Sequence, residues 1–217
     1  MRKLWPGLLA SAAATLFAVL SWPRLPERVA SHWDIDGAVN GTMPRFWLVL
    51  MMPILAVALA GILTIAPKVD PKRRNFPLHA GAYWVVANAV LLFLALVHVL
   101  VIGYNLGWPI QLQVVMMPGL GLLFIVIGNV LTRVRPNWIF GIRTPWTLSS
   151  EVSWRETHRI GGYGFVGVGV AVLITSIVAP TTAIYVMLIG MSIATLLAVV
   201  WSYVAWKRDP NAQGRDA

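Results

Sequence analysis

The sequence has no cysteine in its 217 residues, which excludes disulfide bonds, thiolate catalysis and cysteine-ligated metals. Charge is also scarce, because only 12% of the residues are charged and 8 acidic residues face 17 basic ones. Neither a low-complexity stretch nor a convincing internal repeat is found. What remains is apolar: 58% of the residues are hydrophobic, 11 are tryptophan, and the mean hydropathy is +0.73. This composition lies outside the range of soluble domains and predicts a membrane protein.

Six segments are apolar over the roughly 20 residues that a bilayer span requires. They are approximately Leu4–Trp22, Phe46–Ala66, Tyr83–Tyr104, Val114–Leu131, Gly162–Ala179 and Ile184–Trp206. The first resembles a signal peptide, but no small-residue cleavage pattern follows Leu20, so we interpret it as a retained helix. The sequence therefore predicts an all-α polytopic membrane protein with six transmembrane helices. A short interfacial helix on the cytoplasmic side is expected between the fourth and fifth spans.

The basic residues predict the orientation of these spans. With the N-terminus inside, all but three of the 17 basic residues fall in cytoplasmic segments; the three are Arg24, Arg28 and Arg45. The positive-inside rule thus places both termini and residues 132–161 in the cytoplasm of a bacterium. The formal net charge of +9 fits an anionic lipid surface, so membrane lipid is the expected partner and direct nucleic-acid binding is not. We expect two regions, a two-helix region at 1–66 with an extracytoplasmic loop and a four-helix region at 67–217.

Residues 129–162 form a long polar connection that is rich in tryptophan and arginine, and a long connection of this kind is usually functional. It contains the strings G-N-x-L, R-P-N-W, G-I-R-T-P-W-T-L-S-S-E and W-R-x-T-H-R-x-G-G. These strings resemble the signature of the SdpI family of bacterial membrane proteins. The resemblance implies immunity to a secreted peptide toxin at the outer side. It also implies, for some members, capture of a small helix-turn-helix autorepressor at the cytoplasmic face.

This signature loop (residues 132–161) contains a predicted helix over Glu151–Ile160, with Ser149 or Ser150 as its N-cap and Glu151 in its first turn. We expect the helix to lie in the membrane interface, with tryptophans at headgroup level. One interpretation is a simple anchor; the one we favour is a cytoplasmic docking surface. Its candidate residues are Arg143, Trp146, Glu151, Trp154, Arg155, His158 and Arg159.

The outer loop between the first two spans follows the pattern L-P-x-x-[IV]-x-x-H-[WF]-[DN]-x-x-G from Leu25 to Gly37. It is similar to the uncharacterised N-terminal domain that often precedes the SdpI region. His32, Asp34 and Asp36 could gather around a metal, but their spacing matches no established ligand pattern. Asp and Gly at this spacing are also ordinary turn residues. We favour a structural turn with a hydrogen-bonded His32, and no bound metal, over a ligand or substrate site.

Three polar residues fall within the spans: Asn88 and His98 on the third and Asn129 on the fourth. Polar groups at this depth usually face other helices. We expect Asn88 and Asn129 to pair across neighbouring helices, whereas structural and functional roles for His98 remain equally open. Residues 162–167 match G-x-G-x-x-G, yet they lack the strand and acidic residue of a dinucleotide site. Small residues at Gly162, Gly169 and Ser176 instead predict close helix packing.

The preferred function is therefore a non-enzymatic immunity and signalling protein of the bacterial cytoplasmic membrane, with no catalytic residue, cofactor or metal. Its expected partners are membrane lipid, a secreted peptide toxin and a small cytosolic repressor. Two alternatives stay open. A membrane-embedded, metal-assisted hydrolase could use candidate acid–base groups at His32, Asp34, His98 and His158. A small-solute transporter would use broken helices, for which Pro53 and Pro118 are the available signals.

Overall fold

A computed structural model describes residues 3–212 of the chain. Its α-helices are α1 (Trp5–Ser21), α2 (Arg45–Val69), α3 (Phe76–Asn105), α4 (Leu112–Leu131), α5 (Pro145–Ser149), α6 (Glu151–Val178) and α7 (Ala183–Lys207). Two strands, β1 (Arg28–Trp33) and β2 (Val39–Pro44), separate α1 from α2. Every α-helix but α5 lies in a segment long and apolar enough to cross a membrane, so these residues contain six candidate spans. The predicted all-α, multi-pass membrane fold is confirmed.

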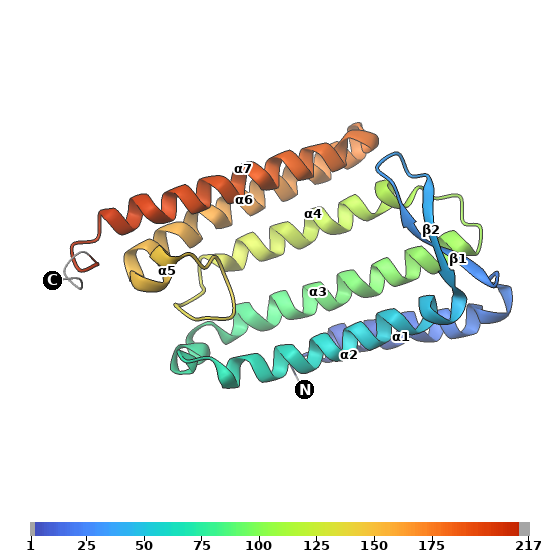
Figure 1. Ribbon diagram of the computed structural model, residues 1–217, viewed down its shortest axis with the longest axis horizontal. Helices are drawn as coiled ribbons and strands as arrows, with labels where there is room; N and C mark the ends of the chain where they lie inside the picture. Colours follow the sequence, from blue (N-terminus) through green and yellow to red (C-terminus); the bar gives the residue numbers. More distant parts are fainter. Residues whose placement is uncertain (1–2, 213–217) are drawn as a thin grey trace.

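The long helices pack in two groups that run roughly parallel along the molecule (Figure 1). In one group α1 packs on α2 and α3, and in the other α6 packs between α4 and α7. The contact between α3 and α4 joins the groups. A buried apolar cluster that includes Ala18, Val29, Leu48 and Ile102 lies where the strands meet the helices. The side chains on the remaining helix faces are apolar and exposed, as lipid contact requires.

Helices α4 and α6 approach closely because glycines face each other at two levels. A Cβ at Gly128 would lie 2.6 Å from the Gly162 carbonyl oxygen, and one at Gly169 would lie 2.6 Å from the Gly121 carbonyl oxygen. Any larger residue would therefore force the two backbones apart. This confirms the close packing predicted from Gly162 and Gly169.

The strands form an antiparallel hairpin that lies across one end of the helices (Figure 1). Its turn has the geometry expected of the Asp and Gly residues: the Asp34 carboxylate accepts hydrogen bonds from the amides of Asp36 (3.1 Å) and Ala38 (2.8 Å), and Gly37 has a φ of 86°. The Asn105 side chain at the end of α3 holds the outer edge of β1. It accepts from the Ala30 amide at 2.7 Å and donates to the Ala30 carbonyl at 3.1 Å. The hairpin itself was not predicted.

The signature loop differs from the prediction in its helices. The segment 151–160 is not a separate interfacial helix; it is the first part of α6, which continues into the membrane-spanning segment. No proline interrupts it, and Gly161 and Gly162 stay helical because they pack against Ile142 and Gly128. The separate short helix is α5, which begins at Pro145 with a capping box between Thr144 and Thr147. The predicted N-cap of α6 is confirmed as Ser150, whose Oγ accepts from the Ser153 amide at 3.0 Å.

Candidate functional site

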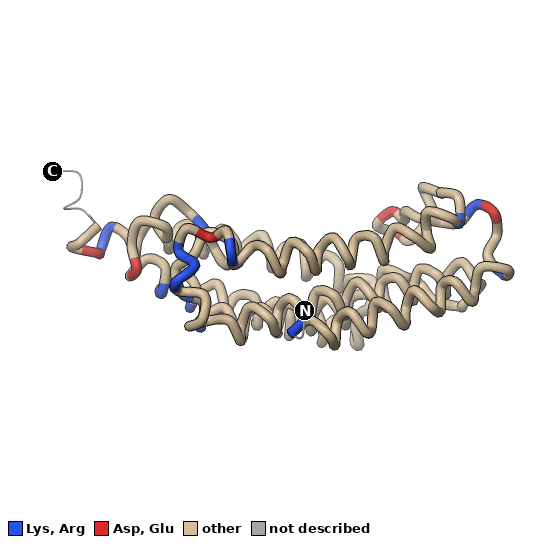
Figure 2. Tube along the Cα trace, turned by 90° about the horizontal axis from the view of Figure 1, so that it is seen from below, with Lys and Arg blue, Asp and Glu red and all other residues tan. Residues whose placement is uncertain are grey.

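The candidate residues gather at opposite ends of the helices. The hairpin end carries His32, Asp34 and Asp36, and the other end, the loop end, carries the signature loop. Figure 2 shows basic residues concentrated at the loop end, whereas the hairpin end has few charges of either sign. The two ends are therefore built differently.

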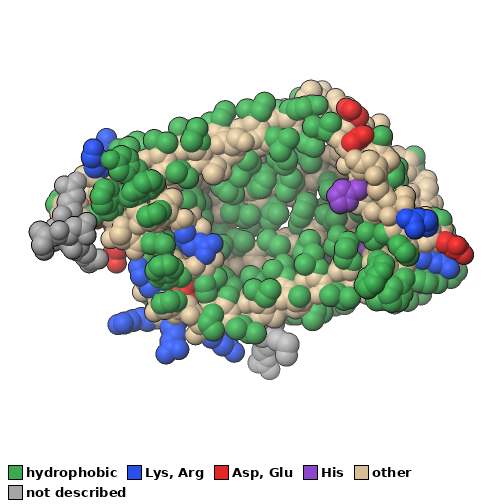
Figure 3. Space-filling view, viewed as in Figure 1, with side chains coloured by type: hydrophobic (Ala, Val, Ile, Leu, Met, Phe, Trp, Pro, Cys, Tyr) green, Lys and Arg blue, Asp and Glu red, His purple; other side chains and the backbone are tan. Residues whose placement is uncertain are grey.

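A pocket of about 350 Å³ lies beneath the hairpin, between the two helix groups. It brings together His32 and Asp34 from the hairpin region with His98 from α3. The remaining wall is mostly apolar and contains five methionines, at positions Met43, Met51, Met52, Met116 and Met117. Figure 3 shows this face of the molecule hollowed between the helix groups, with a histidine at the hairpin end of the hollow. We call this cavity the hairpin pocket.

Two buried polar atoms at the hairpin pocket have no hydrogen-bond partner within residues 3–212, namely Nε2 of His98 and Nε1 of Trp33. His98 is 2% exposed. Trp33 stacks edge-on against Tyr104 at 5.1 Å, which fixes the indole but leaves its N–H unpaired. Unpaired polar atoms are costly in an apolar wall, so a ligand that pairs them would bind with a net gain.

The acidic residues of the hairpin do not form a metal centre. Among the described residues 3–212, no group of three or more His, Asp or Glu side chains is placed to hold a metal ion. Asp34 is used by the turn amides rather than by an imidazole. His32 is exposed and its side chain makes no hydrogen bond in the described chain, contrary to the hydrogen-bonded histidine that the turn interpretation included.

At the loop end, His158 and Trp154 are buried and do not lie on a docking surface. They are 1% and 2% exposed and stack with ring centroids 4.1 Å apart. The Ile142 amide donates to His158 Nε2 at 3.0 Å, so this nitrogen carries no proton, and Nδ1 donates to the Trp154 carbonyl at 2.7 Å. Both ring nitrogens are thus used structurally. Gly141, at φ 114°, passes so close to Nε2 that a Cβ there would collide with it.

Two residues that were not identified from the sequence organise the rest of the loop. The Asn137 side-chain oxygen accepts from the amides of Ile139 (2.8 Å) and Phe140 (2.6 Å), which fixes the turn after Pro136. The Asp70 carboxylate, 5% exposed, accepts from the Trp138 amide at 3.0 Å and ties the α2–α3 connection to the loop. The R-P-N-W string was the available signal for Asn137; Asp70 had none, since it lies 68 residues away.

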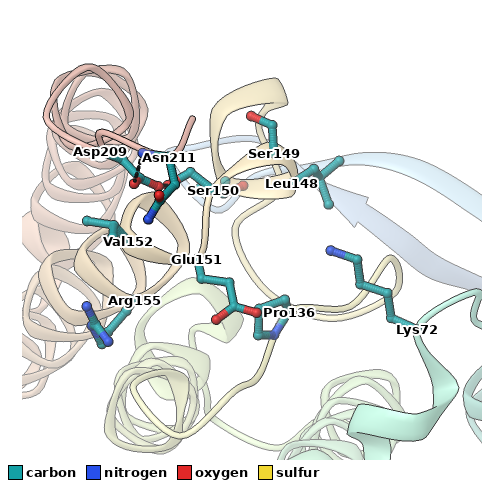
Figure 4. A pocket seen from close by; sticks show the side chains of 11 residues that line it. Lys72, Pro136, Leu148, Ser149, Ser150, Glu151, Val152, Arg155, Asp209 and Asn211 are labelled. Carbon is teal, nitrogen blue, oxygen red and sulfur yellow. Dashed lines mark hydrogen bonds between the residues drawn. The ribbon is translucent and has the colours of Figure 1, made fainter. Parts of the chain in front are cut away.

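The other candidate residues of the loop lie at the surface. Arg143, Glu151, Arg155 and Arg159 are exposed, and Trp146 is half-buried against Tyr203 at a ring distance of 5.2 Å. Glu151 and Arg155 line a polar cavity of about 650 Å³. Figure 4 shows this cavity between Lys72 on one side and Asp209 and Asn211, beyond α7, on the other. Asp209 accepts a hydrogen bond from Ser150 Oγ at 2.5 Å, so the chain after α7 is fastened to the N-terminus of α6.

The two intramembrane asparagines do not pair with each other. Asn88 Oδ1 accepts from the Gly7 amide at 3.0 Å, and its Nδ2 donates to the Lys3 carbonyl at 2.8 Å. Asn88 therefore caps the start of α1, whose free amides need such a partner. Asn129 is exposed on α4 and its side chain makes no hydrogen bond in the described chain. The predicted pairing is wrong because α1, and not α4, packs over Asn88.

Comparisons with known proteins agree with the resemblance carried by the signature strings. Residues 133–203 match the SdpI/YfhL protein family, and residues 9–57 match a domain of unknown function, DUF1648. The chain is 20% identical over 210 residues to the "Immunity protein SdpI" of Bacillus subtilis (strain 168), covering 96% of this chain and 98% of that protein. No solved structure matches the chain. The resemblance to the SdpI family, with the N-terminal domain that precedes its signature region, is confirmed.

Proposed function

From this family resemblance, we propose that the chain is a membrane immunity protein that protects a bacterium against a secreted antibacterial peptide by binding rather than by catalysis. The observation that carries the proposal is the alignment to an immunity protein over nearly the whole of both chains. At 96% of this chain, it includes the hairpin and the signature loop. A protein of this kind needs a site that binds the peptide, and a membrane orientation that places this site on the side from which the peptide arrives.

The hairpin pocket is the proposed peptide-binding site. Its volume of about 350 Å³ is at the lower end of the range for ligand pockets. Trp33 Nε1 can only donate a hydrogen bond, whereas His98 Nε2 accepts in the neutral tautomer that carries its proton on Nδ1. One donor and one acceptor in an apolar wall match a peptide amide beside an apolar side chain. Both atoms are covered in this structure, and the flexible methionines are the side chains that must shift to admit a ligand.

The proposed orientation places the hairpin pocket on the outer side and the signature loop in the cytoplasm. The asymmetry of basic residues supports it through the positive-inside rule. Because the chain lacks cysteine, single cysteines can be introduced at Asn40 in the hairpin and Ser149 in the loop, both of them exposed. A membrane-impermeant maleimide should label the first in intact cells and the second only after permeabilisation. Labelling of both in intact cells would contradict this orientation.

The proposed function is tested by expressing the chain in peptide-sensitive bacteria and measuring the inhibitory concentration of candidate peptides. Protection against none of them would overturn the proposal. In cells that express His98→Leu, the inhibitory concentration of the peptide should fall about tenfold, which is the effect of losing one buried hydrogen bond. His79→Leu is the matched control, since His79 is also a buried α3 histidine with an unpaired nitrogen. His79 borders a cavity of only about 10 Å³, too small for a peptide group. Equal losses in both variants, at equal abundance, would exclude the hairpin pocket as the binding site.

The finer part of the proposal is capture of a small cytosolic repressor at the loop end. What supports it is that Glu151 and Arg155 are exposed at the polar cavity, and that Arg143 is exposed elsewhere on the same loop. Exposed loop residues should affect binding of the repressor, whereas buried loop residues should affect folding. Arg143→Ala should reduce recruitment of a tagged repressor at unchanged membrane abundance, whereas Trp154→Ala should reduce abundance itself because Trp154 fills the loop core. Unchanged recruitment by Arg143→Ala and by Arg155→Ala would rule out this surface.

A further inference from the structure

A groove of about 700 Å³ runs between α4 and α6 near the loop end, and it shares Arg155 with the polar cavity described above. Its walls come from one face of each helix. The α4 wall contains Gly128, Asn129 and Thr132. The α6 wall repeats every three to four residues and runs from Arg155 through Arg159 and Tyr163 to Gly167. The groove exists because Gly128 and Gly162 bring the two backbones together and leave no side chains to fill the space beside them.

The end of the groove at the start of α6 is polar and incompletely paired. The side chains of Arg155, Asn129 and Thr132 make no hydrogen bond or ion pair within residues 3–212. Arg159 is already paired with Glu156 at 2.7 Å, so these two charges offset each other. The groove therefore has a net charge of about +1, carried by a guanidinium with free donors, and two uncharged polar groups beside it. This set matches a singly charged anion.

The other end of the groove is apolar. Tyr163 is 69% exposed, and a Cβ at Gly167 would meet no atom within 4 Å. From residue 155 to residue 167 the helix rises about 18 Å, at 1.5 Å per residue. Over this distance the groove lining changes from charged, at the end of the membrane span, to apolar, toward the middle of the span. A phospholipid has the same order, with a charged headgroup followed by acyl chains.

We propose that this groove binds an anionic phospholipid. The headgroup phosphate accepts charge-assisted hydrogen bonds from Arg155, with Asn129 and Thr132 as further partners, and an acyl chain lies along Gly162 and Gly167. The occupant is a lipid rather than a soluble phosphate because the deeper half of the groove, lined by Tyr163, Val166 and Gly167, has no charged side chain and is mostly apolar. It is an anionic lipid because a net charge of +1 favours a headgroup with one excess negative charge over a zwitterionic one.

The test uses the purified full chain in detergent and native mass spectrometry, with phosphatidylglycerol or phosphatidylcholine of identical acyl chains added. We expect phosphatidylglycerol to be retained and phosphatidylcholine to be lost. Arg155→Gln should lower phosphatidylglycerol retention about tenfold, as for the loss of one charge-assisted contact. Arg73→Gln removes the same charge from an exposed residue at the same end outside the groove, and it should leave retention unchanged.

A second pair of variants tests the apolar half without changing charge. Gly167→Leu should fill the groove and lower retention, whereas Gly61→Leu on α2, where a Cβ also meets nothing, should not. Equal loss in Arg155→Gln and Arg73→Gln would show that lipid binds to diffuse surface charge and would overturn the proposal. Competition by inorganic phosphate with no effect of Gly167→Leu would also overturn it, because the site would then hold a soluble anion.

Discussion

The two ends of this molecule differ in the buried polar groups that organise them, and the loop end also contains unpaired atoms such as Thr157 Oγ1 and His79 Nδ1. At the loop end, His158, Asn137 and Asp70 have their hydrogen-bonding atoms satisfied by backbone groups of the signature loop and, for one Asp70 oxygen, by the Lys72 amide. At the hairpin end, His98 and Trp33 have unpaired buried nitrogens beside a pocket large enough for a ligand. Paired groups of this kind stabilise one conformation. An unpaired group is informative about binding only when a cavity adjoins it, as the contrast between His98 and His79 shows.

Gly141, at the loop end, is the position where we expect a substitution to cause the largest loss of stability. Gly141→Ala places a Cβ against His158 at a positive φ of 114°. We expect the free energy of unfolding to fall by about 3–5 kcal/mol, from backbone strain and loss of the His158 contact together. The control is Gly107→Ala near the hairpin end, at φ 86° with open space around it, which should cost only about 1–2 kcal/mol of strain. Thermal unfolding in detergent measures both, and equal shifts would contradict a specific role for His158.

The histidines at the two ends should also differ in their contribution to stability. His158→Ala leaves the Ile142 amide unpaired and removes the stack on Trp154, so we expect a loss of about 3 kcal/mol. His32→Ala should change stability by less than about 0.5 kcal/mol because its side chain is exposed and unpaired. Denaturation in detergent checks this order. A destabilised His32→Ala variant would show that the hairpin histidine is structural after all.

Features that depend on neighbouring residues could be predicted from the sequence. The spans were found because hydropathy over about 20 residues is sufficient to identify them. Ser150 and the Asp34–Gly37 turn were found because caps and turns use residues close together in the chain. Gly162 and Gly169 were found because a spacing of seven residues places small side chains on one helix face.

The predictions that were wrong or missing concern contacts between residues that are far apart in the sequence. The hairpin was missed because β1 depends on Asn105, 75 residues along the chain from Ala30, rather than on an alternating apolar pattern. Trp154 and His158 were interpreted as surface residues because residues 151–160 were expected to form a separate helix in the membrane interface. Their burial results from the turns at Asn137 and Gly141, which fold the loop over them. The hairpin pocket could not be predicted because it combines residues of both strands with residues of α2, α3, α4 and α7.

Asn105 allows a smaller test of how the hairpin end is held. Asn105→Ala should leave both the amide and the carbonyl of Ala30 unpaired, at a cost of about 1–2 kcal/mol. Amide hydrogen exchange should become faster at Ala30 and its neighbours in β1, with the loop end unchanged. Asn129→Ala is the control, since its side chain has no partner in the described chain, and it should alter exchange at neither end. Slow exchange at Ala30 in the Asn105 variant would mean that β2 alone holds β1.

The smallest effect is expected at the ion pair between Arg159 and Glu156. The pair is short, at 2.7 Å, but the Arg159 side chain is 54% exposed, so solvent and salt screen the attraction. We expect Arg159→Gln to lower stability by less than about 0.5 kcal/mol. That contrasts with His158, one residue earlier, where burial makes each hydrogen bond costly to lose. The melting temperature in low and high salt measures the difference. A loss as large as that of His158→Ala, unchanged by salt, would show that this exposed face of α6 also belongs to the packed loop end.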